Sequence, residues 1–152
     1  MRTILFVCTG NTCRSPMAEA FARAVVAEGQ FEGVLPSEVL IASAGIAASE
    51  GAPPSEETSR ILHSRGLESE SRSMQLTPEM VANADLVLTM TRGHLDAISR
   101  YIAPTDDAMG HVLMLDPEGD VLDPIGCGAP AYEEVASRFD ELIPLRLKEF
   151  FS

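Results

Sequence analysis

Two cysteines and an arginine lie close together near the start of the chain, in the segment CTGNTCR. Five residues separate Cys8 from Arg14, and Cys13 stands directly before Arg14. A cysteine thiolate is both a nucleophile and a metal ligand, and an arginine guanidinium binds phosphate oxygens through two parallel hydrogen bonds. The segment therefore has four interpretations: a metal site, a redox pair of thiols, two inert buried cysteines, or a nucleophile in an anion-binding loop.

The residues on either side of this segment predict how it is held. The continuous apolar run TILFV (3–7) predicts a strand that is buried on both faces. The stretch SPMAEAFARAVVAEG (15–29) predicts a helix, since a serine and a proline suit its start and a glycine suits its end. The segment from Cys8 to Arg14 would then join the carboxyl end of a strand to the amino end of a helix.

A loop in this position is suited to bind an anion. Its backbone N–H groups, from Thr9 onward, can converge on one anion, and Gly10 allows the backbone to approach it closely. Arg14 adds a permanent positive charge, and the same field favours the thiolate form of Cys8. A thiolate next to a bound phosphoryl group is an activated nucleophile.

The competing interpretations explain less of the sequence. A zinc site needs about four ligands, yet the histidines are scattered at positions 63, 94 and 111. No Cys-x-x-Cys redox motif is present. Two inert cysteines would leave Arg14 and Ser15 unexplained. We therefore expect an anion-binding loop with a nucleophile, and neither a metal nor a cofactor.

The remaining segments predict an alternation of strands and helices. Strands are expected over residues 39–45, 85–90 and 111–115, and helices over 55–66, 77–84, 91–102 and 132–151, with Pro144 kinking or breaking the last one. Residues 116–130 are expected to form a loop. This order predicts a single α/β domain over residues 1–152, a four-stranded parallel sheet with helices on both faces. Ligands of such sheets bind at the edge where the strands end.

Composition narrows the class of protein further. The 152 residues carry a net charge of −12, which should repel nucleic acid and anionic membranes. No apolar run reaches the ~20 residues of a membrane span, and the apolar part of MRTILFVCTG is too short for a signal peptide. Three cysteines suggest reduced thiols rather than a disulfide scaffold. We expect a cytoplasmic monomer that binds no nucleic acid and no membrane.

The segment CTGNTCRSP, placed between a strand and a helix, resembles the signature of the low-molecular-weight protein tyrosine phosphatases. The resemblance continues through SAG (43–45), ADLVLTMT (84–91) and DVLDPIG (120–126), and so covers nearly the full length. It implies a metal-independent protein phosphatase that forms a phosphocysteine intermediate and acts on phosphorylated proteins.

The resemblance also implies a role for each loop residue. Cys8 would be the nucleophile, and Arg14 would hold the phosphate and the transition state. Cys13 would be a second thiol that traps oxidised Cys8 as a reversible disulfide. The side chains implied to support the loop by hydrogen bonds are Asn11, Ser15 and Ser43.

A phosphatase of this kind needs a general acid, and the sequence offers two Asp-Pro candidates. The tripeptide LDP occurs at residues 115–117 and again at 122–124, both times after the predicted fourth strand. Asp-Pro is also a common turn signal. The resemblance selects Asp123, because DVLDPIG carries the family's pattern, whereas Asp116 directly follows the strand.

Two further positions bear on the substrate. Tyrosine-directed members of the family line the pocket with aromatic rings, but Ile125 follows Asp-Pro here and Tyr132 is the nearest aromatic residue beyond it. Thr12 stands where those members usually carry an aliphatic residue, and CTGNTCRS resembles the bacterial protein arginine phosphatases. The general acid Asp123 could pair with the guanidinium of phosphoarginine as well as protonate it. Phosphoarginine is therefore the favoured substrate, with phosphotyrosine as the alternative.

Other features leave minor alternatives open. The family usually has a histidine where Ser71 stands, so support of the loop must differ here, and His63 is expected to be an ordinary surface or core histidine.

Cys127, beyond Asp123, would be the only further thiol for a thiol-dependent arsenate reductase, which normally needs more cysteines. A non-catalytic phosphate binder would be expected to lack the cysteine, the arginine or the aspartate, and all three are present.

Overall fold

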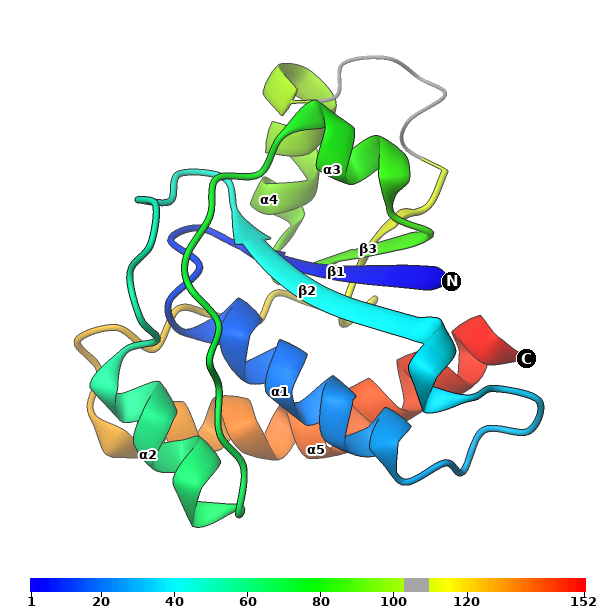
Figure 1. Ribbon diagram of the computed structural model, residues 1–152. Coiled ribbons are helices and arrows are strands. Elements are labelled where there is room, and N and C mark those ends of the chain that lie inside the picture. Colours follow the sequence, from blue (N-terminus) through cyan, green and yellow to red (C-terminus); the bar gives the residue numbers. More distant parts are fainter. Residues whose placement is uncertain (103–109) are drawn as a thin grey trace.

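The computed structural model describes residues 1–102 and 110–152, so the expected domain of residues 1–152 includes seven positions, 103–109, outside the described residues. Its strands form one parallel sheet in the order β2-β1-β3-β4 (Figure 1). Their bounds are β1 (Arg2–Cys8), β2 (Val39–Gly45), β3 (Leu86–Thr89) and β4 (Val112–Met114). The predicted four-stranded parallel sheet is confirmed.

Helices cover both faces of this sheet. They are α1 (Arg14–Ala27), α2 (Glu56–Ser64), α3 (Pro78–Asn83), α4 (Arg92–Ala97) and α5 (Ala129–Phe151), with a short 3-10 helix η1 (Pro36–Glu38) and a π-helix η2 (Ile98–Ile102). Figure 1 shows α1, α2 and α5 on one face and α3 and α4 on the other. Ile4 and Phe6 of β1 pack into the core on the α1 side, while Leu5 and Val7 pack into the core on the opposite side. A central strand buried in this way must be apolar at every position, as TILFV is.

Hydroxyl side chains begin three of the helices. Ser55 accepts a hydrogen bond from the backbone N–H of the third residue of α2, and Thr77 and Thr91 do the same for α3 and α4. These caps satisfy N–H groups that have no partner inside the helix. Ser55 and Thr77 are also the residues at which the sequence predicts the helices over 55–66 and 77–84 to begin.

The structure corrects several predicted boundaries. The expected helix over residues 91–102 divides after Ala97, where η2 begins. Helix α5 begins at Ala129 rather than at residue 132, because Pro130 occupies its first turn, where proline is tolerated. The helix also continues through Pro144, so of the expected kink or break, the break is wrong. The buried side chains of Ile143 and Leu147 hold α5 against the core on both sides of the proline.

The parallel arrangement brings the ends of β1, β2 and β3 to one edge of the sheet, where the loop of residues 9–13 leads into α1 (Figure 1). Within the two described ranges, no helix combines the length and apolar character that crossing a membrane requires. The candidate residues of the sequence analysis gather at that edge.

Candidate active site

The loop of residues 9–13 makes a turn that depends on two particular residues. Asn11 has a φ of 57°, a left-handed conformation that asparagine adopts more readily than most residues. Gly45 at the end of β2 lies against this turn: a Cβ atom there would collide with the carbonyl oxygen of Thr9 and stand 3.1 Å from the Asn11 nitrogen. Glycine at the end of the SAG segment therefore lets the loop pass close to β2.

The backbone of this loop presents unpaired hydrogen-bond donors. The N–H groups of residues 9–14 donate no hydrogen bond to any residue that the structure describes, and α1 has no side-chain cap at its amino end. Free N–H groups in a tight loop and at the start of a helix attract anions. The loop can thus bind an anion next to the thiol of Cys8.

Buried hydrogen bonds support the loop from beneath. The Sγ of Cys8 lies 3.0 Å from the Oγ of Ser15, and the Nδ2 of Asn11 donates to Ser15 Oγ at 2.7 Å. The same Nδ2 donates to Ser43 Oγ at 2.9 Å, and Ser43 donates to Glu19 Oε1 at 2.8 Å. All five side chains are buried. The structure therefore brings Asn11, Ser15 and Ser43 together around Cys8.

Glu19 is the member of this network that the sequence analysis missed. Burial raises the pKa of its carboxyl group, while the hydrogen bond from Ser43 and the positive charge of Arg23 act in the opposite direction. Arg23 Nη2 lies 3.2 Å from Glu19 Oε2. A signal was present in the sequence, because Glu19 stands four residues after Ser15 and four before Arg23, so these three polar residues share one side of α1.

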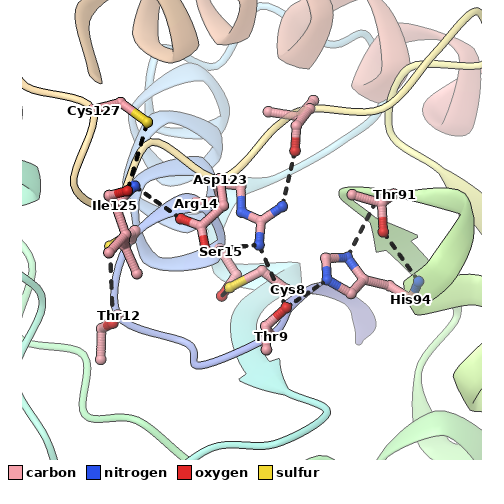
Figure 2. A network of polar contacts seen from close by, with 12 residues as sticks. Cys8, Thr9, Thr12, Arg14, Ser15, Thr91, His94, Asp123, Ile125 and Cys127 are labelled. Atoms are coloured by element: carbon pink, nitrogen blue, oxygen red, sulfur yellow. Dashed lines mark hydrogen bonds and ion pairs between the residues drawn. The ribbon is translucent and has the colours of Figure 1, made fainter. Parts of the chain in front are cut away.

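Arg14 is buried and points across the loop toward the segment that follows β4. Its Nη1 donates to the carbonyl oxygen of Val121 at 2.9 Å, and its Nη2 donates to Thr9 Oγ1 at 3.5 Å. The same Nη2 lies 3.7 Å from Asp123 Oδ2. Figure 2 shows the guanidinium between Asp123 and Thr9, with His94 beyond Thr9. The arginine and the predicted acid therefore meet at one point next to Cys8.

The two Asp-Pro segments have different environments. Asp116 accepts a hydrogen bond from the Glu118 N–H at 2.9 Å and pairs with Arg138 of α5 at 2.6 Å. These contacts, the backbone hydrogen bond first, lower the pKa of Asp116. The side chain of Asp123 is 44% exposed, and its Oδ1 accepts the Ile125 N–H at 3.1 Å. Asp123 is thus the aspartate that can reach a ligand held by Arg14.

Cys13 contacts Tyr132 and the residue that caps α2. The Sγ of Cys13 donates to Ser55 Oγ at 3.4 Å and lies 3.4 Å from the Tyr132 hydroxyl. Tyr132 is buried, which raises the pKa of its phenol above the usual value. Thr12 is fixed beside them, because its carbonyl oxygen accepts the Ser55 N–H at 2.8 Å and its Oγ1 lies 3.9 Å from Cys13 Sγ.

The exposed neighbours of Asp123 in the sequence are aliphatic. Ile125 and Leu122, on either side of Asp123 in the sequence, are exposed. The ring of Tyr132 is buried in the core and so does not line the rim. Cys127 is exposed in the same loop, with its Sγ 3.6 Å from the carbonyl oxygen of Ile125 (Figure 2).

Two positions singled out in the sequence lie apart from this network. The Ser71 N–H donates to Ser69, and His63 is exposed on α2. In this segment the loop is instead supported by the backbone of Met74, whose N–H donates to Asn11 Oδ1 at 3.0 Å. In the part of the chain that the structure describes, no three His, Cys, Asp or Glu side chains gather as metal ligands would.

Comparisons with known proteins agree with this geometry. The family model described as low molecular weight phosphotyrosine protein phosphatase matches residues 3–149. A protein-arginine-phosphatase of Geobacillus stearothermophilus is 37% identical over 92% of this chain and 90% of its own length. The low molecular weight protein-tyrosine-phosphatase PtpB of Staphylococcus aureus is 33% identical over 95% of this chain and 94% of its own.

A solved structure of an arginine phosphatase has the same fold as this chain. The YwlE arginine phosphatase, crystallised as a cysteine-to-serine mutant with a phosphorylated active-site serine, superposes with a TM-score of 0.86 at 32% identity. The superposition covers 97% of this chain and 94% of that one. The family model, the relatives and the shared fold all lead to one conclusion: this chain belongs to the low molecular weight phosphotyrosine protein phosphatase family.

Proposed function

We propose that the protein hydrolyses phosphoarginine on proteins, with Cys8 as the nucleophile, Arg14 as the phosphate clamp and Asp123 as the general acid and base. The proposal is carried by the meeting of three groups at one edge of the sheet: a buried thiol, a buried guanidinium and a partly exposed carboxyl group. The backbone N–H groups of residues 9–14, which donate to no residue that the structure describes, suit the oxygens of a phosphoryl group. Thr9, Gly10 and Thr12 belong to this loop.

In the first step the sulfur of Cys8 attacks phosphorus. An S–P bond forms and the P–N bond of phosphoarginine breaks, with its electron pair leaving on nitrogen. Asp123, as the carboxylic acid, gives its proton to that nitrogen. Arg14 and the loop N–H groups stabilise the charge on the phosphoryl oxygens, so we expect activity to be unaffected by a chelator.

In the second step water attacks the phosphocysteine. The O–P bond forms, the S–P bond breaks with its electron pair returning to Cys8, and Asp123 takes up the proton of the water. Ser15 Oγ, 3.0 Å from Cys8 Sγ, supports the thiolate as nucleophile and as leaving group. The phosphorylated serine in the YwlE mutant supports a covalent intermediate in a relative.

The side chains near Asp123 favour phosphoarginine over phosphotyrosine as the substrate. A phosphotyrosine ring would gain from stacking on aromatic walls, about 0.5–1.5 kcal/mol for each contact. Here Tyr132 is buried beneath the loop, and the exposed neighbours of Asp123 are Leu122 and Ile125. The side chain of Asp123 can pair with a guanidinium as readily as it pairs with Arg14, whereas a phenol offers it no charge.

The test compares two peptides of identical sequence that carry either phosphoarginine or phosphotyrosine. We expect a higher kcat/KM for phosphoarginine, and we expect Thr12→Ile to shift the ratio toward phosphotyrosine. Ser59→Ala, on the exposed side of α2, is the matched control and should leave the ratio unchanged. A preference of the wild type for phosphotyrosine would reject phosphoarginine as the substrate, and a ratio that Thr12→Ile does not move would reject Thr12 as the residue that sets the preference.

Phosphotyrosine remains the second candidate, because the similar PtpB protein is named as a tyrosine phosphatase. In both cases the substrates are proteins. A cytoplasmic location, a monomeric state and the absence of nucleic-acid or membrane binding belong to the proposal as well; sedimentation of the purified chain tests the monomer directly.

A further inference from the structure

His94 has a ring whose two nitrogens are both engaged. It lies in the first turn of α4 and is only 4% exposed. Its Nδ1 accepts the backbone N–H of Thr91 at 3.2 Å, and its Nε2 lies 2.9 Å from the Oγ1 of Thr9. Because a backbone N–H can only donate, Nδ1 carries no proton in this arrangement. The proton of the neutral ring is therefore on Nε2 and points to Thr9.

The surroundings of His94 keep the ring neutral. Burial, and then the positive charge of Arg14, lower its pKa to about 4, although Asp120 and Asp123 act in the opposite direction. At neutral pH the ring is thus a fixed donor through Nε2. It cannot serve there as a proton carrier for catalysis, because Nδ1 already has its donor and the Nε2 proton is held by Thr9.

The hydroxyl of Thr9 receives two hydrogen bonds. One comes from His94 Nε2 at 2.9 Å and the other, longer one from Arg14 Nη2 at 3.5 Å. A hydroxyl oxygen has two lone pairs and one proton, so both acceptor positions of Thr9 are occupied and its proton is left to donate outward. Thr9 is exposed and directly follows Cys8. Figure 2 shows its hydroxyl between the imidazole and the guanidinium.

We propose that His94 is a positioning residue that acts through Thr9: it turns the Thr9 hydroxyl into a donor to a phosphoryl oxygen of the substrate and fixes the position of Arg14. The inference rests on the proposed function, since it needs a phosphoryl group next to Cys8. It adds a side-chain donor to the backbone donors of the loop, and it connects α4 to the site. Capping of α4 accounts for the contact of Nδ1 with the Thr91 N–H. It does not account for the contact of Nε2 with Thr9.

The first test removes the hydroxyl of Thr9. Thr9→Val keeps the shape of the side chain and loses the donor, whereas Thr9→Ser keeps the donor. A hydrogen bond to a charged group corresponds to a loss of about 10- to 100-fold when the donor is removed. We expect that loss in kcat/KM on p-nitrophenyl phosphate, with a parallel weakening of competitive inhibition by inorganic phosphate. Thr9→Ser should remain within about threefold of wild type.

The second test asks whether His94 acts through Thr9. His94→Leu should weaken phosphate inhibition in the same direction as Thr9→Val, and the double variant should lose no more than Thr9→Val alone, because residues that act in series are not additive. His63→Gln, an exposed histidine of α2, is the control and should be unchanged in every measurement. Circular dichroism reports whether each variant is folded.

Three outcomes would overturn the inference. Thr9→Val could bind inorganic phosphate as tightly as wild type, the losses of the two single variants could multiply in the double variant, or His94→Leu could lower only the melting temperature. If His94→Leu does not fold, His94→Asn takes its place, because its side-chain oxygen can still accept the Thr91 N–H while the donor to Thr9 is lost. A separate outcome concerns the proposed function: turnover that persists in Cys8→Ser would reject it, whereas an inactive Cys8→Ser with an unaffected Thr9→Val would reject only the role of Thr9 and His94.

Discussion

Asn11 is the residue at which the support of the loop can be measured most directly. Its side chain makes three hydrogen bonds: two from Nδ2 to Ser15 and Ser43, and one from the Met74 N–H to Oδ1. Its backbone is left-handed, with φ at 57°. Two variants separate these contributions. Asn11→Gly removes the hydrogen bonds and tolerates the backbone, while Asn11→Ala removes the hydrogen bonds and also strains the backbone.

The magnitudes follow from the contacts. Three buried hydrogen bonds at about 1 kcal/mol each predict a loss of about 3 kcal/mol in the free energy of unfolding for Asn11→Gly. A left-handed alanine costs roughly 1–2 kcal/mol more, so Asn11→Ala should be the less stable of the two. Because Ser15 then loses the donor that orients it toward Cys8, both variants should also show a kcat/KM lowered by about tenfold or more.

Urea unfolding followed by circular dichroism measures the stabilities, and turnover of p-nitrophenyl phosphate measures the activity. Ser59→Ala, on the exposed side of α2, is the matched control and should change neither quantity. Equal stability of the two Asn11 variants would refute the argument from the backbone. An Asn11→Gly protein as stable as wild type would refute the argument from the hydrogen bonds.

Three further predictions concern the acid, the buried histidine and the thiols. Asp123→Asn should lower kcat by about 100-fold or more as a lost general acid does, whereas Asp116→Asn should cost less than about tenfold; the opposite order in steady-state kinetics would reassign the acid. Because the pKa of His94 is lowered from 6.5 to about 4, the unfolded chain binds its proton first as the pH falls. About 3 kcal/mol of stability should therefore be lost between pH 7 and pH 4, and urea unfolding of His94→Gln should show a smaller loss over that range. Peroxide should inactivate the enzyme reversibly through a disulfide between Cys8 and Cys13; if Cys13→Ser still regains full activity with thiol, Cys13 has no such role.

The fold could be predicted from the sequence because its signals are local. TILFV is apolar at every position, and Ser55 and Thr77 mark the starts of α2 and α3. Predictions failed where tertiary contacts outweighed a local rule. Pro144 should break a helix by itself, but the buried residues on both sides of it keep α5 continuous.

The loop of the site was predictable from its residues because they are close in sequence, whereas the distant Ser43 and Asp123 followed only from the resemblance to the phosphatase family. Cys8, Arg14 and the loop between them form one contiguous motif. The contacts that the sequence analysis missed join distant segments: His94 reaches Thr9 across 85 positions, and the Met74 N–H reaches Asn11 across 63. No periodicity or spacing reports such contacts, because they depend on which strand ends the parallel sheet brings together.

The repeated LDP tripeptide shows how identical local sequences acquire different uses. Asp116 is held by Arg138 of α5, and the same arginine binds a backbone carbonyl of the loop. The loop continues to Val121, whose carbonyl oxygen orients Arg14, and then to Asp123. The first copy thus fixes the segment from which the second copy meets Arg14. Asp116→Asn should consequently reduce the rate without changing the shape of the pH–rate profile, whereas Asp123→Asn should remove the limb of that profile that belongs to the general acid.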